Sequence, residues 1–293
     1  MQIDVKHLTY VYSEKSKDMA VKAIDDVSLA IGEGIFGVIG HTGSGKSTFI
    51  QHINGLLKVQ KNRGKITVGE FDLTDKKCDF KKLRSKVGMV FQYPEYQLFA
   101  ETIKEDVAFA LKNFCKGISE EEKEKRVKKA IETVGLDYEK CKDKSPFEVS
   151  GGQKRRVAIA GVIVAEPEIL VLDEPVAGLD PKGKKEFLEL IRTLVKTVVK
   201  TVVIVSHDMN LIAENCDRAA IFSHGKIYAV GTPEQVFNDA GDVIGLGLEL
   251  PLVLKLKNAL KEKGVKLASG VSEKEFVDEI ASKFAVKPKE SEK

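Results

Sequence analysis

The feature that most constrains the fold is a glycine-rich segment that joins an apolar stretch to a predicted helix. Residues 40–47 read Gly-His-Thr-Gly-Ser-Gly-Lys-Ser, after the apolar residues 35–39 and before residues 48–57, which are predicted to be helical. Glycines let the backbone curl so that successive N–H groups face one anion, and the positive end of the following helix strengthens that site. This order of strand, loop and helix predicts a phosphate-binding loop in an α/β fold.

Residue types within this loop predict individual contacts. Lys46 is expected to reach the β- and γ-phosphates of a nucleotide, and the Ser47 hydroxyl is expected to ligate Mg²⁺. A glycine-rich turn with a chance lysine is the simpler alternative, and the correct order of strand, loop and helix argues against it. The remaining nucleotide-binding positions that we predict here are Gly40, His41, Thr42, Gly43, Ser44, Gly45 and Thr48.

A second apolar stretch ends in two carboxylates. Residues 169–172 are followed by Asp173 and Glu174, and α/β sheets bind ligands at the carboxyl ends of their strands. We expect Asp173 to hold the Mg²⁺ and Glu174 to act as the general base or to position water. Two carboxylates can also simply end a strand, but the phosphate-binding loop favours the catalytic interpretation.

Composition and charge narrow the class of protein. Lys and Arg total 47 against 44 acidic residues, so the net charge is only +3 and no nucleic-acid partner is expected. The longest apolar run, residues 157–165, is far shorter than the roughly 20 residues that cross a bilayer. No signal peptide is recognisable, and the four cysteines show no Cys-x-x-Cys spacing. A cytoplasmic globular protein is expected.

Strand and helix signals divide the chain into regions. Half-buried antiparallel strands are predicted where β-branched and polar residues mix, at 3–12, 21–31 and 65–73. Short apolar strands of a parallel sheet are predicted at 35–39, 87–92, 169–172 and 201–205. Capping boxes are predicted at Ser119 with Glu122 and at Thr232 with Gln235.

The pattern changes after residue 241. Val253, Leu256 and Leu260, and later Phe276, Ile280 and Phe284, form apolar stripes on two predicted amphipathic helices. We therefore expect one domain over 1–241, with a helical subdomain inserted at about 93–165. A helical extension is expected over 242–286 and a flexible tail over 287–293.

Further motifs resemble those of the ATP-binding cassette (ABC) ATPases over residues 1–240. Residues 149–153, Val-Ser-Gly-Gly-Gln, resemble the family signature, with valine where leucine is usual. The resemblance implies nucleotide contacts for Ser150, Gly151, Gly152, Gln153 and also for Gln92, Asp180 and Tyr12. Gln92 resembles the Q-loop glutamine and would also reach the metal, Asp180 resembles the D-loop aspartate, and Tyr12 resembles the aromatic residue that stacks on adenine.

Residue His207 resembles the switch histidine of the same family, and with Glu174 and Lys46 it completes the predicted catalytic set. Each likeness has a plainer alternative: Tyr12 and nearby Tyr10 can be ordinary strand residues, and a lone histidine more often caps a helix or fills a core. Residues 150–153 would also cap the helix predicted at 153–165.

The resemblance implies a P-loop NTPase fold of the ABC ATPase type. Such a fold has a parallel α/β core sheet, an antiparallel β subdomain and a helical subdomain, here with a small C-terminal helical extension. ATP and Mg²⁺ are the implied cofactors. In the family, the signature segment faces the γ-phosphate held by the partner subunit, so one chain contains one half of each of two sites and a head-to-tail dimer is implied.

A finer likeness points to the ATPases of energy-coupling factor (ECF) transporters. It is carried by residues 91–99, 105–109 and 155–162, while residues 40–43, 147–150 and 177–181 look more like the second (A-prime) ATPase. Val176 departs from the threonine that is usual there. The resemblance implies a heterodimer with a sister ATPase, a membrane T component, and substrate-binding S components carrying vitamins or metal ions. It places the chain on the cytoplasmic side of the cell membrane as a peripheral subunit.

Two other classes of function compete with this interpretation. A non-transport ABC ATPase acting on nucleic acid or ribosomes usually carries a coiled-coil insertion or two cassettes, and this chain has one cassette and nearly balanced charge. A regulatory module that binds ATP without hydrolysis is disfavoured by Glu174 and His207. We also expect residues 92–99 to line a groove that receives a cytoplasmic helix of a membrane partner, with Glu95 facing an arginine there.

Overall fold

A six-stranded sheet forms the centre of the molecule. The structure is a computed structural model that describes residues 1–12, 20–238, 243–268 and 270–284. The strands follow the order β10-β9-β3-β8-β7-β6, and all neighbours are parallel except β10, which is antiparallel to β9. The predicted parallel α/β sheet is therefore confirmed. The strands are β3 (Gly34–Ile39), β6 (Val87–Val90), β7 (Ile169–Asp173), β8 (Thr201–Val205), β9 (Arg218–Ser223) and β10 (Lys226–Gly231).

A second, antiparallel sheet has the order β2-β1-β4-β5. Its strands are β1 (Ile3–Tyr12), β2 (Val21–Ile31), β4 (Lys65–Val68) and β5 (Phe71–Asp72). The prediction of one strand over 65–73 was wrong, because Gly69 adopts a left-handed conformation with φ of 54° and turns the chain back on itself. A left-handed turn of this kind costs glycine little.

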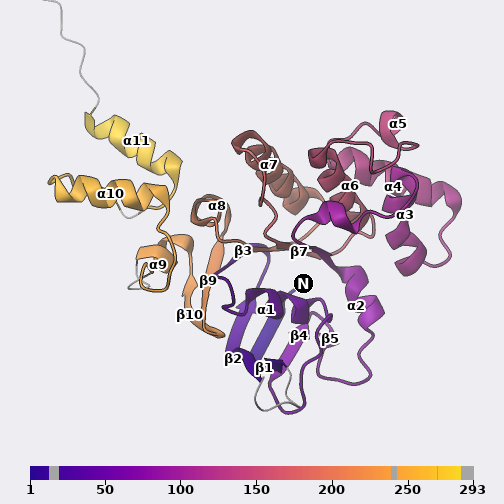
Figure 1. Cartoon of the computed structure of the whole chain (residues 1–293), viewed down its shortest axis with the longest axis horizontal. Coiled ribbons are helices and arrows are strands. Elements are labelled where there is room, and N and C mark those ends of the chain that lie inside the picture. Colours follow the sequence, from indigo (N-terminus) through magenta and orange to yellow (C-terminus); the bar gives the residue numbers. More distant parts are fainter. Residues whose placement is uncertain (13–19, 239–242, 269, 285–293) are drawn as a thin grey trace, which may run out of the picture.

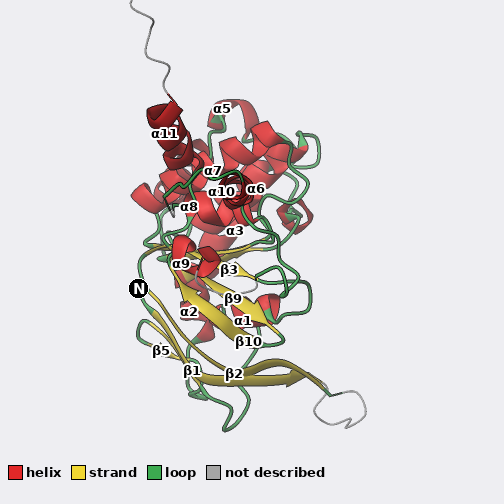
Figure 2. Cartoon of the chain, turned by 90° about the vertical axis from the view of Figure 1, so that its left-hand side faces the viewer, coloured by secondary structure: helices red, strands yellow, loops and turns green. Residues whose placement is uncertain are grey.

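The two sheets and the helices are arranged in layers (Figure 2). Helix α1 (Lys46–Ile53) lies between the sheets, where Phe49, Ile50 and Ile53 join both of them in one core. The opposite face of the six-stranded sheet is covered by α6 (Gly151–Ile163), α7 (Pro181–Thr197) and α8 (Met209–Asn215). The sheet is thus buried on both faces, which explains why its strands are almost wholly apolar.

A group of helices lies beside the sheet, to the right in Figure 1. It comprises α2 (Phe80–Lys86), the short 3₁₀ helix η2 (Pro94–Gln97), α3 (Ile103–Phe114), α4 (Glu120–Thr133), α5 (Tyr138–Cys141) and the start of α6. Val127 and Ile131 form part of the buried face of α4. Ser119 caps α4 by accepting from the N–H of Glu122, but the Glu122 side chain binds Arg126 instead, so the predicted capping box is only half formed.

The C-terminal helices lie at the other end of the molecule (Figure 1). Helix α9 (Pro233–Asn238) begins with the predicted capping box of Thr232 and Gln235. Helices α10 (Leu252–Glu262) and α11 (Glu273–Phe284) follow. Val253 is buried, whereas Leu256 is exposed and α11 has no buried residue. The predicted tail over 287–293 lies outside the described residues.

Candidate functional site

A cleft of about 530 Å³ opens where β3, β7 and β8 end. Segments that are far apart in the sequence meet there because parallel strands place their carboxyl ends on the same edge of the sheet. Val21, Lys22, Ala23 and Val205 also line the cleft, and nothing in the sequence singled them out. The predicted site residues that line it are Tyr12, Thr42, Gly43, Gly45, Lys46, Ser47, Thr48, Gln92, Asp173, Glu174 and His207.

The glycine-rich loop connects β3 to α1 and forms one wall of the cleft. Gly43 and Gly45 have φ of 81° and 104°, in the left-handed region that favours glycine. A Cβ atom at Gly45 would also collide with the carbonyl oxygen of Ala23. The N–H of Gly225, in the turn between β9 and β10, donates to the carbonyl of Ser44 at 3.0 Å. The loop is therefore held by the β9–β10 turn on one side, while Thr42, Gly43 and Gly45 line the cleft.

Lysine 46 is the first residue of α1 and is only 8% exposed. Its Nζ donates to the carbonyl oxygens of Gly40 at 2.6 Å and His41 at 2.9 Å. Burial lowers the pKa of Lys46, and the carboxylates of Glu174 and Asp173 partly oppose that shift. The ammonium is thus buried against the loop with backbone carbonyls as its hydrogen-bond partners, and an anion in the cleft would be a stronger one.

Two carboxylates lie opposite the loop. Burial raises the pKa of Asp173, the negative charge of Glu174 raises it further, and Lys46 lowers it. Glu174 has a left-handed backbone with φ of 46°, uncommon for a residue other than glycine. Its N–H donates to the carbonyl of Val205 at 2.9 Å, which fixes it against β8. Strained residues of this kind gather at functional sites.

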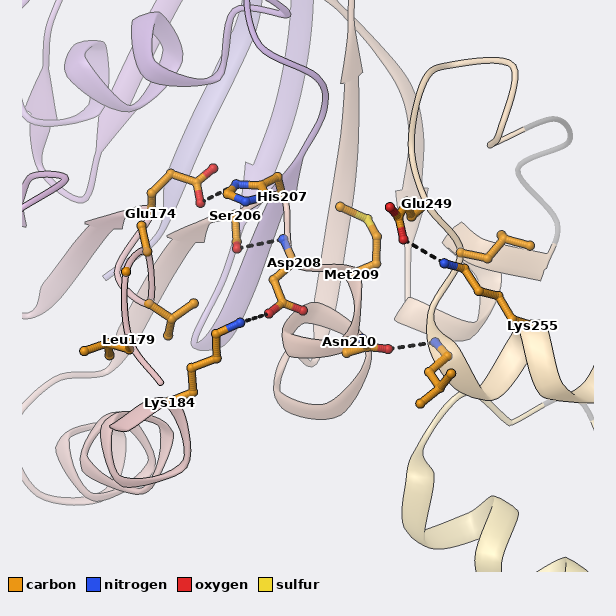
Figure 3. Close-up of a pocket in the computed structure, with 15 residues that line it drawn as sticks. Glu174, Leu179, Lys184, Ser206, His207, Asp208, Met209, Asn210, Glu249 and Lys255 are labelled. Atoms are coloured by element: carbon orange, nitrogen blue, oxygen red, sulfur yellow. Dashed lines mark hydrogen bonds and ion pairs between the residues drawn. The ribbon is translucent and has the colours of Figure 1, made fainter. Parts of the chain in front are cut away.

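Residue His207 reaches Glu174 from the end of β8. Its Nδ1 lies 2.9 Å from Oε2 of Glu174 (Figure 3). The Glu174 side chain is 14% exposed and that of His207 is 72% exposed. A largely buried carboxylate thus has an imidazole as its neighbour, an arrangement suited to orienting a water molecule and moving its proton.

The two tyrosines of β1 have different surroundings. The Tyr12 hydroxyl lies 3.2 Å from Oγ1 of Thr48, and the ring lines the cleft. Tyr10 packs edge-on against both Tyr12 and the buried His52, with centroid separations of 4.9 and 4.7 Å. Tyr12, and not Tyr10, therefore presents its ring to the cleft.

Several predicted residues lie outside the cleft. Gly40, His41 and Ser44 belong to the loop but do not line the cavity. Asp180 caps α7 by accepting from the N–H of Gly183 at 2.7 Å. The signature residues Ser150, Gly151, Gly152 and Gln153 are exposed. They form the N-terminus of α6, where Ser150 and Gln153 make a reciprocal capping box.

Residues 92–99 differ from expectation in three respects. Pro94 begins the 3₁₀ helix η2, so half of the segment is a short helix. Leu98 is buried and does not line a surface. Glu95 is already paired within the chain, since its Oε2 lies 3.7 Å from the Arg155 guanidinium. Tyr96 and Phe99 are 85% and 59% exposed, as expected of residues available to another chain.

Comparisons with known proteins agree with this geometry. The family model described as "ABC transporter" matches residues 24–177. The Energy-coupling factor transporter ATP-binding protein EcfA2 of Clostridium tetani is 51% identical, covering 98% of this chain and 97% of that protein. The protein of the same name from Clostridium acetobutylicum is 47% identical over the full length of both chains.

Solved structures show the same fold. CbiO1 from Clostridium perfringens, described as part of the ABC transporter complex cbiONQ, has a TM-score of 0.72 and 34% identity, covering 89% of this chain and 96% of that chain. A dimeric ATP-binding cassette in a post-hydrolysis state with ADP and Pi has a TM-score of 0.69 and 29% identity, covering 79% of this chain and 98% of that one. None of the described helices is long and apolar enough to cross a membrane. The chain belongs to the ABC transporter family, among its energy-coupling factor transporter ATP-binding proteins.

Proposed function

We propose that this chain binds Mg-ATP in the cleft and hydrolyses it as the second ATPase of an ECF-type importer. The observation that carries the proposal is the convergence of Lys46, Asp173, Glu174 and His207 on one cavity beside the glycine-rich loop. Family membership makes the chain an ATPase, and the following roles are our assignment to individual residues.

The phosphates would lie against the loop, where Lys46 exchanges its two carbonyl partners for phosphate oxygens. The backbone N–H groups around Gly43 and Gly45 would donate to the same oxygens, as loops of this kind do. Tyr12 would stack on the base, since it lines the cleft, is 38% exposed and lies with its hydroxyl 3.2 Å from that of Thr48.

The side chains of Ser47, Gln92 and Asp173 suit Mg²⁺. All three line the cleft and supply oxygen ligands, which this cation prefers. The raised pKa of Asp173 shows a carboxylate whose charge is not fully compensated by its surroundings, as expected where a cation binds. When bound, Mg²⁺ would neutralise part of the phosphate charge.

Hydrolysis would be carried out by the two residues in contact. Glu174 would accept a proton from the attacking water, and His207 would orient Glu174 and stabilise charge on the transferring phosphoryl group. Lys46 would stabilise the same charge from the side of the loop. Water would reach the site from the open cleft, because the His207 side chain is mostly exposed.

A second ATPase subunit is needed to complete the site. The exposed α6 N-terminus at Ser150 and the cleft are separate features of this chain, and a head-to-tail pair would bring one against the other. The dimeric cassette among the structural relatives supports such pairing. We propose that the partner is the sister ATPase, and that membrane T and S components complete an importer of vitamins or metal ions. The chain would then be peripheral on the cytoplasmic side of the membrane.

Exposed aromatic residues mark the proposed contact with the membrane component. Tyr93, Tyr96 and Phe99 are 43%, 85% and 59% exposed and lie just after Gln92. Exposed aromatic groups are frequent in interfaces. Since Glu95 already faces Arg155 within the chain, at 3.7 Å and without a hydrogen bond to its Oε2 among the described residues, docking would depend mainly on the aromatic side chains.

The C-terminal extension would support subunit pairing. We propose residues 1–241 as the ATPase domain, with about 93–165 as its helical subdomain, and 242–286 as an extension. Apolar residues of α10 and α11 are exposed, among them Leu256, Val277 and Phe284. A partner subunit would bury them, as expected for exposed apolar surface.

Purification of the intact complex tests this function. The tagged chain is recovered from native membranes in mild detergent, and each co-purifying chain is identified. A second ATPase and at least one membrane-spanning chain are expected, with Mg²⁺-dependent ATP hydrolysis by the complex. Recovery with ribosomes or nucleic acid and no membrane chain would favour a non-transport ATPase. A membrane complex without hydrolysis would favour the regulatory module.

A further inference from the structure

Two side-chain bridges join the segment after β7 to the segment after β8. At one end, Oε2 of Glu174 lies 2.9 Å from Nδ1 of His207. At the other end, Nζ of Lys184 lies 3.0 Å from Oδ2 of Asp208. Figure 3 shows both bridges on the wall of a second cleft, of about 460 Å³. Residues 174–184 are therefore tied at both ends to two consecutive residues.

The His207 side chain depends on its backbone for position. It is 72% exposed, and among the described residues Glu174 is the side chain that its ring nitrogen contacts. A largely exposed imidazole has little packing to fix its rotamer. The backbone on either side must therefore hold His207 beside Glu174, whose buried Oε2 lies 2.9 Å from Nδ1 but has no well-aligned hydrogen-bond donor among the described residues.

Both neighbours of His207 are fixed by hydrogen bonds. Ser206 is fully buried, and its N–H donates to the carbonyl of Val38 at 3.2 Å. Its hydroxyl accepts from the N–H of Asp208 at 3.0 Å. Oδ1 of Asp208 caps α8 by accepting from the N–H of Leu211 at 3.1 Å. The other carboxylate oxygen is the one that Lys184 binds.

The partners of Asp208 favour its ionised form. Burial acts to raise the pKa of Asp208, but the hydrogen bonds from Lys184 and from the N–H of Leu211 hold it below its ordinary value. Lys184 lies in the first turn of α7, where its N–H donates to the carbonyl of Asp180 at 2.9 Å. A movement of residues 177–180 would thus displace Lys184 and, through its ion pair, Asp208.

We propose that Lys184 is a positioning residue for His207: by holding Asp208, it fixes the backbone from which His207 meets Glu174. This inference rests on the proposed function, because it gives Lys184 a part in turnover only if Glu174 and His207 act there. It also gives the loop at 177–180, which a partner subunit would contact, a direct physical connection to the catalytic pair.

An ordinary stabilising ion pair is the alternative. Lys184 and Asp208 side chains are 41% and 22% exposed, and ion pairs at such positions commonly add little to stability. If the pair is merely structural, removing it would lower the melting temperature slightly and leave the turnover of folded protein unchanged. If it positions His207, removing it would lower kcat while ATP affinity and KM stay the same.

Steady-state ATP hydrolysis by the purified complex distinguishes the two. The ATP hydrolysis that remains in the Glu174→Gln complex measures the contribution of the sister subunit, and it is subtracted from the rate of every other variant. Lys184→Met should lower kcat about tenfold, less than the roughly 100-fold that a misplacement of about 1 Å can cause. KM for ATP should stay within about twofold of wild type. Lys184→Arg, which keeps the charge and the reach, should retain most of the activity.

Two further variants make the test specific. Asp208→Asn keeps the α8 cap, because asparagine caps helices as well as aspartate, but loses the charge that Lys184 binds. It should lower kcat to a similar degree, and combining it with Lys184→Met should cause no further loss. Lys185→Met removes an exposed lysine from the same turn of α7 and should leave kcat unchanged.

The outcomes separate this inference from the function on which it rests. Wild-type kcat in Lys184→Met, an equal loss in Lys185→Met, or additive losses in the double variant would overturn the positioning role. If Lys184→Met fails to fold or assemble, the comparison of Lys184→Arg with Asp208→Asn decides, and equal activity in both overturns the role. Equal ATP hydrolysis by the wild-type complex and by the Glu174→Gln complex would instead remove the proposed function.

Discussion

Replacing Lys46 by methionine should separate nucleotide binding from stability. Methionine keeps most of the apolar stem of the side chain and removes the charge, so the packing at the start of α1 is largely retained. Lys46 is 8% exposed, and among the described residues its Nζ binds the carbonyls of Gly40 and His41 and forms no ion pair at contact distance. Lys46→Ala, which also leaves a cavity, provides a second variant.

The expected loss of affinity follows from the bonds that ATP would form. On binding, the ammonium exchanges two neutral carbonyl acceptors for charged phosphate oxygens, and a hydrogen bond involving a charged group contributes about 1.5–3 kcal/mol. Mg-ATP should therefore bind roughly 10- to 150-fold more weakly. Turnover should be lost as well, because the same charge would stabilise the transferring phosphoryl group.

Stability should change little, because two effects oppose each other. The carbonyls of Gly40 and His41 lose a donor, which costs about 1 kcal/mol each. Removal of a buried charge offsets that cost: burial lowers the pKa of Lys46, so its charged form opposes folding below that pKa. The melting temperature of the nucleotide-free chain should stay within about 3 °C of wild type. Any relative gain of the variant should be constant below the lowered pKa and shrink as the pH rises from there to the ordinary pKa of lysine.

Calorimetric titration with Mg-ATP and thermal unfolding of the same samples measure both quantities. Lys61→Met, which removes an exposed lysine outside the cleft, is the matched control and should bind ATP normally. Wild-type ATP affinity in Lys46→Met would refute the assignment of the phosphate site. A large fall in melting temperature would show that the charge is needed for the fold itself.

Four further outcomes are expected. Glu174→Gln should bind ATP but hydrolyse it at least about 100-fold more slowly and accumulate as a closed dimer in size-exclusion chromatography, whereas near wild-type turnover would mean that Glu174 is not the base. Asp173→Asn should raise the melting temperature of the nucleotide-free chain by about 2 °C at pH 7, because burial and Glu174 raise the pKa of Asp173 and its ionised form opposes folding. That gain is lost below about pH 3, where the carboxyl is protonated in both states, and its persistence there would contradict the reasoning. A photocrosslinker at Tyr96 should capture a membrane chain and one at Tyr228 should not; no crosslink from residue 96 would remove the docking role. Phe284→Ser should reduce co-purification of the sister ATPase without altering ATP affinity, and unchanged co-purification would favour packing within the chain.

The glycine-rich loop could be predicted from the sequence because its geometry is local. A buried strand, glycines that accept positive φ, and a helix that begins at Lys46 follow one another along the chain. The carboxyl ends of β7 and β8 could be located by the same reasoning, since an apolar run followed by polar residues marks the edge of a parallel sheet. Asp173 and His207 therefore reach the same cleft, as expected.

Partners that are distant in the sequence could not be predicted. Glu95 pairs with Arg155, 60 positions later by residue number, only because η2 packs on α6. On α4, Glu124 binds Lys104 and Tyr138 instead of the lysine one turn away. A residue on a helix surface has several partners of similar energy, and only the tertiary arrangement selects among them. Gly69 is a turn signal in the sequence, but the β-branched residues around it favour a continuous strand.

The two helix N-termini that the sequence marks for anion binding differ in what surrounds them. The first turn of α1 forms the wall of the cleft, with the Lys46 ammonium buried beside it. The first turn of α6 is exposed, and its donors are only partly satisfied by the capping box of Ser150 and Gln153. An exposed positive helix end gains little from water but considerably from a buried phosphate. A nucleotide held between the two ends would therefore be bound more tightly than at either alone. Because these ends are separate within one chain, tight binding and closure of the pair would be the same event.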